Sequence, residues 1–150
     1  PIRLPKDQRN LKFIEEKILI NKLDNYVYLF KQVKNFSMLL SACDIFLYPV
    51  SSMTGKIDIP LTVLEAMAAE LPIIISNIEP LNEILKLKAG FTISPSDIPN
   101  FASAILTLSK DPNSRKQMGR LGRKIIEKHY NLNMMIDAYE NLYNEFTRAL

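Results

Sequence analysis

The chain has only one cysteine, Cys43, and one histidine, His129, among its 150 residues. A single cysteine excludes an intrachain disulfide. Because Cys43 directly precedes a hydrophobic run, we expect it to pack as a small apolar residue rather than to act as a nucleophile. A single histidine gives little basis for a zinc site or a Ser-His-Asp triad built from this chain alone. We therefore expect neither a metal nor another cofactor.

Long apolar runs and a signal peptide are also missing. No run approaches the roughly 20 residues that span a bilayer, so we expect a cytoplasmic location. The chain has four glycines and no G-x-G-x-x-G fingerprint, which argues against a fragment of a Rossmann dehydrogenase. Its 19 basic and 16 acidic residues are well mixed, so no nucleic-acid partner is expected.

The densest group of basic residues lies within residues 113–129. Its helical spacing indicates a solvated helix face, and contact with a membrane surface is the alternative. Association with a membrane therefore remains open. The group consists of Arg115, Lys116, Arg120, Arg123, Lys124 and Lys128.

Strand and helix patterns alternate along the chain. Apolar or aromatic runs predict four strands, and periodic apolar positions predict helices between and after them. This order indicates an α/β fold, a Rossmann-like parallel sheet with helices on both faces, in a single domain over residues 1–150 that ends in the helices of 113–150. The predicted strands are 26–30, 44–49, 72–76 and 90–93, and the predicted helices 7–23, 35–42, 61–70, 83–87, 97–110, 113–129 and 132–150.

The last of these helices carries a stripe of methionine, aliphatic and aromatic residues. At this spacing such a stripe is more typical of core packing than of a cofactor site. The stripe consists of Met135, Ile136, Tyr139, Leu142, Tyr143 and Phe146.

The most informative segment is residues 58–76, a loop, a helix and a buried strand. Pro60 suits the first turn of a helix, and the amides that follow, at Leu61, Thr62 and Val63, have no helical partner. With the helix dipole they form an anion site. A carboxylate one turn further, at Glu65, can accept hydrogen bonds from a vicinal diol such as a ribose. The pattern is that of a nucleotide bound to an α/β sheet.

Other readings of these positions stay open. Glu65 lies among apolar residues on what we expect to be a buried stripe, where an unpaired carboxylate is costly. It should therefore meet a ligand, a backbone donor or a basic partner, and a ligand is the preferred interpretation. Thr62 could equally serve helix-start packing. The loop 50–60 leaves the carboxyl end of the strand 44–49, where such sheets bind ligands, and this places Ser51 and Ser52 near the site.

The segment resembles the donor-binding motif of GT-B glycosyltransferases of the family-four type, the glycosyl transferases group 1. The resemblance extends to 26–30, to the strand 42–49, to Asn82-Glu83-Ile84 and to Ala89-Gly90-Phe91, and so covers nearly the whole chain. The residues that match the motif itself are Pro60, Leu61, Glu65, Ala66, Met67, Ala68, Leu71 and Pro72.

The resemblance implies the C-terminal, donor-binding domain of a retaining enzyme that moves a sugar from a UDP-, GDP- or ADP-sugar to a glycan or lipid acceptor, without a metal. Glu65 would bind the ribose, and the amides around Leu61 and Thr62 would face the diphosphate. Phe30 to Val33 would lie against the base, although Phe30 is more consistent with a core residue. The terminal helix would reach back toward the other domain, which leaves part of its stripe exposed here or in a self-contact.

Several positions depart from the family pattern. The family pattern has two acidic residues, and the position of the earlier one is occupied here by Ile57. Asp58 stands at the position of a family glycine, and it could take over the role of the earlier acidic residue only in a rearranged loop. A further glycine is replaced at Glu70, and a Gly-Gly pair by Glu79-Pro80. The basic phosphate loop has no match in residues 1–25, and the N-terminal acceptor domain is missing. We therefore expect a fragment, a donor domain truncated at its N-terminal side and inactive alone; a non-catalytic binding or assembly module of the same fold is the alternative.

Overall fold

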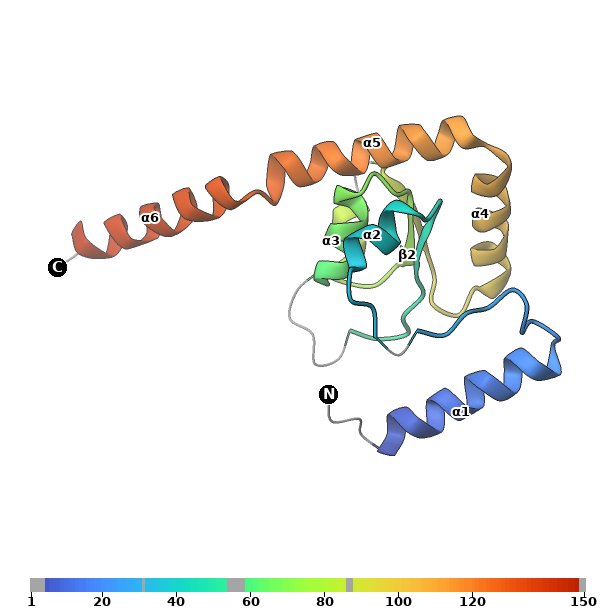
Figure 1. Cartoon of the computed structure of the whole chain (residues 1–150). Coiled ribbons are helices and arrows are strands. Elements are labelled where there is room, and N and C mark those ends of the chain that lie inside the picture. The colour runs from blue at the N-terminus through green and yellow to red at the C-terminus, as the bar shows by residue number, and fades with distance from the viewer. Residues whose placement is uncertain (1–4, 31, 54–58, 86–87, 149–150) are drawn as a thin grey trace. The chain divides into compact units, whose positions relative to one another are not determined.

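The computed structural model describes residues 5–30, 32–53, 59–85 and 88–148 (Figure 1). By its contacts the chain divides into two units, residues 1–34 and 35–150, and each is described by itself. That the whole chain forms a single domain stays a prediction.

The first unit consists of helix α1 (Pro5–Ile20), a turn and an extended segment. The amides of Tyr26 and Val27 both donate to the carbonyl of Leu23, at 2.9 Å, so the segment predicted as strand 26–30 begins inside a turn. This strand prediction is wrong. A β-branched and aromatic run forms a strand only where a neighbour completes its hydrogen-bond ladder, and no described residue pairs with this one.

The second unit is built on a three-stranded parallel sheet in the order β1-β2-β3. Its strands are β1 (Phe46–Tyr48), β2 (Ile73–Ser76) and β3 (Gly90–Ile93), which confirms the other three predicted strands. Phe46 of β1 and Gly90 of β3 both lie opposite Ile73 of β2. The central strand β2 is buried on both faces, as its uninterrupted apolar run predicts.

Helices cover both faces of this sheet (Figure 1), as predicted. On one face Ile73 and Ile75 pack in a cluster with Val63 and Met67 of α3 (Leu61–Ala68). On the other face Ile74 packs with side chains of α4 (Ile98–Lys110). The short helix α2 (Phe36–Ser41) precedes β1, and a 3-10 turn, η1 (Leu81–Leu85), stands between β2 and β3. The cluster of Ile73 and Ile75 with the side chains of α3 is what holds α3 against the sheet.

Helix α5 (Pro112–His129) is capped at its start by Asp111 and packs closely against α3. The Asp111 carboxylate accepts from the Ser114 hydroxyl at 2.6 Å and from the amides of Ser114 and Asn113, both at 3.0 Å. The Ser114 hydroxyl and these amides hold the pKa of Asp111 below its usual value. Further along, Gly119 and Gly122 are buried where α5 meets the end of α3. The absence of side chains there lets the two elements approach.

Glu70, just after α3, occupies a position where the resembled family has glycine, and its φ of 59° lies in the left-handed region. That region costs a non-glycine residue about 1–2 kcal/mol. We therefore expect Glu70→Gly to raise the free energy of unfolding by about 1 kcal/mol in urea denaturation. Its neighbour Ala69 has a φ of −83°, so Ala69→Gly should instead lower stability, by about 0.5–1 kcal/mol. Equal effects at the two positions would contradict this interpretation.

The last helix, α6 (Leu132–Arg148), lies beyond the end of α5 (Figure 1). All its residues from 132 to 147 are exposed, including Tyr143, at 64%. The prediction that the apolar stripe of α6 packs in a core is therefore wrong for residues 132–147. The structure instead shows the exposed stripe that the family resemblance implies. Periodicity reveals that one helix face is apolar but not what covers it. No helix among the described residues is long and apolar enough to cross a membrane.

Candidate functional site

The start of α3 presents backbone amides without a cap. Pro60 is the N-cap residue, no side chain caps the helix, and the Pro60 carbonyl accepts from Val63 at 2.9 Å. No described residue supplies an acceptor for the amides of Leu61 and Thr62, and both residues are exposed. Free amides and the positive end of a helix dipole can hold a phosphate. That these two residues bind a ligand stays a prediction.

Glu65 lies one turn further along α3 and lines a pocket of about 380 Å³. The pocket is formed by α2 and α3 together with Arg123 of α5. Glu65 is exposed, so its predicted place on a buried stripe is wrong. The side of α3 that packs on the sheet carries Val63, Ala66 and Met67, and Glu65 falls outside it. This carboxylate is therefore not a buried charge and needs no compensating partner.

The Glu65 carboxylate has no partner among the described residues. Arg123 shares the pocket, but its Nε donates to Glu127 at 2.7 Å and its Nη1 to the carbonyl of Ala68 at 2.8 Å. Of the three partners expected for Glu65, the backbone donor and the basic side chain are thus not found in the described part of the chain. Its oxygens are available to accept hydrogen bonds from a bound molecule.

Ser37 and Ser41 of α2 line the same pocket, although neither is predicted as a site residue from the sequence. The Ser41 hydroxyl donates to the carbonyl of Ser37 at 3.0 Å. A signal was present: the two serines are four residues apart, so they share a side of the helix. Two serines and an unpartnered carboxylate in the lining make this pocket suited to a polyhydroxylated ligand.

For the other predicted site residues, the structure gives the exposure of the side chain or does not describe the residue. Ser51 and Ser52 are exposed, in the loop that leaves β1, where Met53 anchors the chain in the core. Asp58 lies outside the described residues, as does Ile57.

Phe30 and Val33 belong to the first unit and are described only within it. Phe30 is 66% exposed, so no core within the first unit buries it. That Phe30 packs in a core or lies against a base stays a prediction. Val33 is half-buried.

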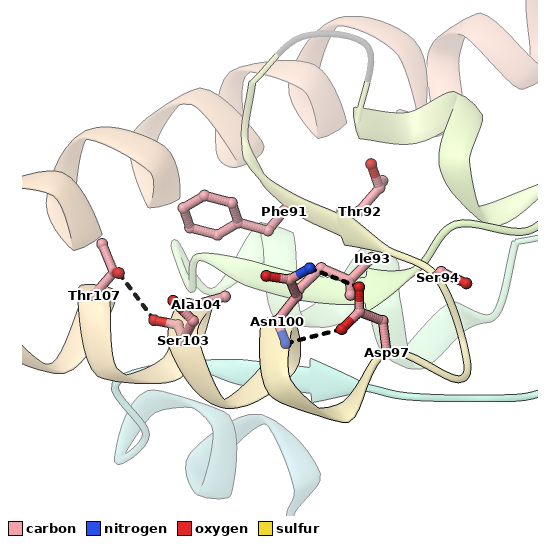
Figure 2. Close-up of a pocket in the computed structure, with 9 residues that line it drawn as sticks. All are labelled: Phe91, Thr92, Ile93, Ser94, Asp97, Asn100, Ser103, Ala104 and Thr107. Atoms are coloured by element: carbon pink, nitrogen blue, oxygen red, sulfur yellow. Dashed lines mark hydrogen bonds between the residues drawn. The ribbon is translucent and has the colours of Figure 1, made fainter.

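A second groove, of about 370 Å³, lies between β3 and α4 (Figure 2). Its polar groups are largely used locally: Asp97 accepts from the amide of Asn100 at 3.1 Å and from its side chain at 2.6 Å. The Thr107 hydroxyl donates to the Ser103 carbonyl at 2.9 Å. The Asp97 carboxylate would also repel a phosphate. This groove is therefore a poorer nucleotide site than the start of α3.

No described residues form a metal site: no group of three or more histidine, cysteine or acidic side chains is arranged to hold an ion.

The family model for Glycosyl transferases group 1 matches residues 7–125. The chain belongs to this family. The match includes α3 and the pocket around Glu65, and it confirms the resemblance carried by the motif at 60–72.

Curated relatives within the glycosyltransferases are 26–33% identical to this chain over the residues that align. The capsular polysaccharide biosynthesis glycosyltransferase CapM of Staphylococcus aureus is 26% identical over 124 residues, 81% of this chain and 31% of CapM. A UDP-Gal:alpha-D-GlcNAc-diphosphoundecaprenol alpha-1,3-galactosyltransferase of Escherichia coli is 33% identical over 106 residues, 70% of this chain and 26% of that enzyme. A GDP-mannose-dependent phosphatidylinositol monomannoside mannosyltransferase of Corynebacterium glutamicum is 27% identical over 106 residues, 69% of this chain and 28% of that enzyme. The chain thus spans about a third of these relatives or less.

Solved structures confirm the fold. Sucrose-phosphate synthase from Thermosynechococcus elongatus superposes with a TM-score of 0.82 at 22% identity, over 93% of this chain and 35% of that one. The C-terminal domain of a glycosyl transferase group 1 family protein from Francisella tularensis gives 0.70 at 22% identity, over 86% of this chain and 66% of that one. The second unit therefore has the fold of a C-terminal GT-B domain.

Proposed function

We propose that this chain is the donor-binding part of a retaining glycosyltransferase that takes its sugar from a nucleoside diphosphate. The observation that carries the proposal is the unpartnered Glu65 carboxylate, one helical turn from the uncapped start of α3. Relatives named as GDP-mannose-dependent and UDP-Gal-using support this class of donor. The helix start would hold the diphosphate, and Glu65 would hold the ribose.

In this proposal the chain's chemical role is to stabilise a leaving group. When an acceptor hydroxyl oxygen bonds to the anomeric carbon, the bond from that carbon to the diphosphate oxygen breaks. Its electron pair moves onto the diphosphate oxygen, which takes up the hydroxyl proton. The amides of Leu61 and Thr62 and the helix dipole stabilise the growing negative charge. Glu65 fixes the nucleoside by accepting from both ribose hydroxyls, which keeps the diphosphate against the helix end. No step in this scheme needs a metal.

The complete enzyme would add an acceptor domain, whose surface would cover the exposed apolar face of α6. The proposed acceptor is a glycan or a lipid-linked sugar, since two of the relatives are named for lipid-linked acceptors. Such an acceptor implies peripheral contact with a membrane. The chain alone should bind donor weakly and should not turn over.

The second candidate is a non-catalytic binding or assembly module of the same fold. Two departures favour it: Ile57 replaces an acidic residue of the resembled enzymes, and residues 1–25 carry no basic phosphate loop. Joining the chain to the upstream segments of its natural gene product separates the two candidates. Sugar transfer by the joined protein supports an enzyme, and donor binding without transfer supports the module.

The direct test is an NMR titration of the chain with UDP, GDP and ADP, followed through backbone amide shifts. We expect saturable shifts at residues 59–66 and at Ser37 and Ser41, with one base preferred. Absence of shifts at these residues at about millimolar nucleotide, equivalent to a binding free energy weaker than about −4 kcal/mol, would contradict a donor site in this chain.

A further inference from the structure

The basic residues of α5 divide into two sets. Arg115 pairs with Asp44 at 3.3 Å and donates to the carbonyl of Leu108 at 2.6 Å, and Arg123 is held by Glu127 and the carbonyl of Ala68. These two arginines join α5 to the rest of the unit. The remaining four have no ion pair or hydrogen bond with a described residue and are all exposed: Lys116, Arg120, Lys124 and Lys128.

These four cations, the α5 basic row, follow one another at intervals of four residues. Such residues lie on the same side of a helix, so the row extends about 18 Å along it. At about 100° per residue, the row is centred opposite Gly119, Gly122 and Ile125, which pack against the rest of the unit. The only acidic residue of α5, Glu127, is paired with Arg123. From the other elements, Asp44 and Glu70 line a pocket with Lys116, and Asp44 is paired with Arg115. No described ion pair joins a carboxylate to the row, so the row is a positive surface directed away from the core.

A shallow groove of about 340 Å³ runs beside the row. It is lined by three of the cations, Lys116, Arg120 and Lys124, together with Asn113, Gln117 and Leu121. Cations and amide donors in one groove are suited to phosphate groups. The groove contains no aromatic side chain on which a nucleic-acid base could stack. A straight row of cations on a helix is instead typical of contact with anionic lipid headgroups.

We propose that the α5 basic row binds the surface of an anionic phospholipid bilayer. The inference rests on the membrane contact in the proposed function and assigns it to one helix face. Because the row is separate from the α3 site, lipid binding and nucleotide binding should be independent.

The test is co-sedimentation of the full chain with vesicles of phosphatidylcholine alone or with about 30% phosphatidylglycerol. We expect binding only to the anionic vesicles, lost between about 0.1 M and 1 M salt. The row variant, K116Q with R120Q, K124Q and K128Q, should bind them at least about 100-fold more weakly. The matched control removes as many charges elsewhere: K12Q with K22Q, K34Q and K110Q, which should retain binding.

Each other outcome overturns the inference. Equal losses in the row variant and the control would mean that net charge alone drives binding. Binding to a single-stranded RNA but not to anionic vesicles would assign the row to another partner. The backbone amide NMR spectrum without nucleotide serves as the second readout: a row variant whose amide shifts outside α5 match those of the unmodified chain is folded, whether or not nucleotide binds. Loss of lipid binding therefore cannot be confused with failure of the donor site.

Discussion

Glu65→Ala is expected to weaken binding of the preferred nucleoside diphosphate by at least about 100-fold. The Glu65 carboxylate has no partner among the described residues, so a bound ribose would gain both of its hydrogen bonds without displacing a protein group. Hydrogen bonds to a charged acceptor contribute about 1.5–3 kcal/mol each, and the substitution removes two. Since Glu65 is exposed and lies outside the packed side of α3, the variant should fold normally. Isothermal titration calorimetry measures the change.

A deoxy nucleotide makes the Glu65 test specific for the ribose. The 2′-deoxy form of the nucleotide should bind the unmodified chain about tenfold more weakly, because one charge-assisted bond is lost. Glu65→Ala should bind the ribo and deoxy forms equally. As a control for charge, Glu140→Ala on the exposed face of α6 should bind like the unmodified chain. A Glu65→Ala variant that still discriminates the two sugars would contradict the assigned role.

The sheet could be predicted from the sequence because its strands carry their own signal. Residues 71–75 form an uninterrupted apolar run, which is typical of a strand buried on both faces, and the structure places the strand β2 at the centre of the sheet. The run at 26–30 has equal strand propensity but no neighbour to pair with in the described part of the chain. Strand propensity is local, whereas a strand is a pairing between segments, so the sequence pattern could not separate these two runs.

The candidate site was predicted in outline, and its environment was not. Pro60 and the motif around Glu65 located the helix start correctly. The prediction that Glu65 is buried was wrong because the apolar residues of 61–68 are spread around the helix, so that several of its sides could face the core. The packing of α3 on β2 determines which residues are buried, namely Val63, Ala66 and Met67. Ser37 contributes to the pocket through α2, which lies far from α3 in sequence. Pockets of this kind depend on tertiary packing.

Gly119→Ala is expected to destabilise the second unit by about 3 kcal/mol, a large effect for one methyl group. A Cβ at Gly119 would overlap the carbonyl carbon and oxygen of Glu70, and neither atom belongs to a side chain that could rotate away. Glu70 is itself held at a φ of 59°, so this backbone has little freedom to adjust. The clash must therefore push α5 away from the end of α3. Urea unfolding followed by circular dichroism measures the loss.

Gly122, three residues further along α5, provides the matched control. A Cβ there would lie 3.5 Å from the Met67 Cβ and 3.7 Å from the Ala89 Cβ, which are ordinary contact distances. Alanine favours a helix interior over glycine by about 0.5–1 kcal/mol, so Gly122→Ala should raise stability. The same substitution on one helix is thus expected to have opposite signs at two positions. Destabilisation of similar size at both would mean that α5 rejects any added methyl group, rather than that Gly119 alone is confined by the Glu70 backbone.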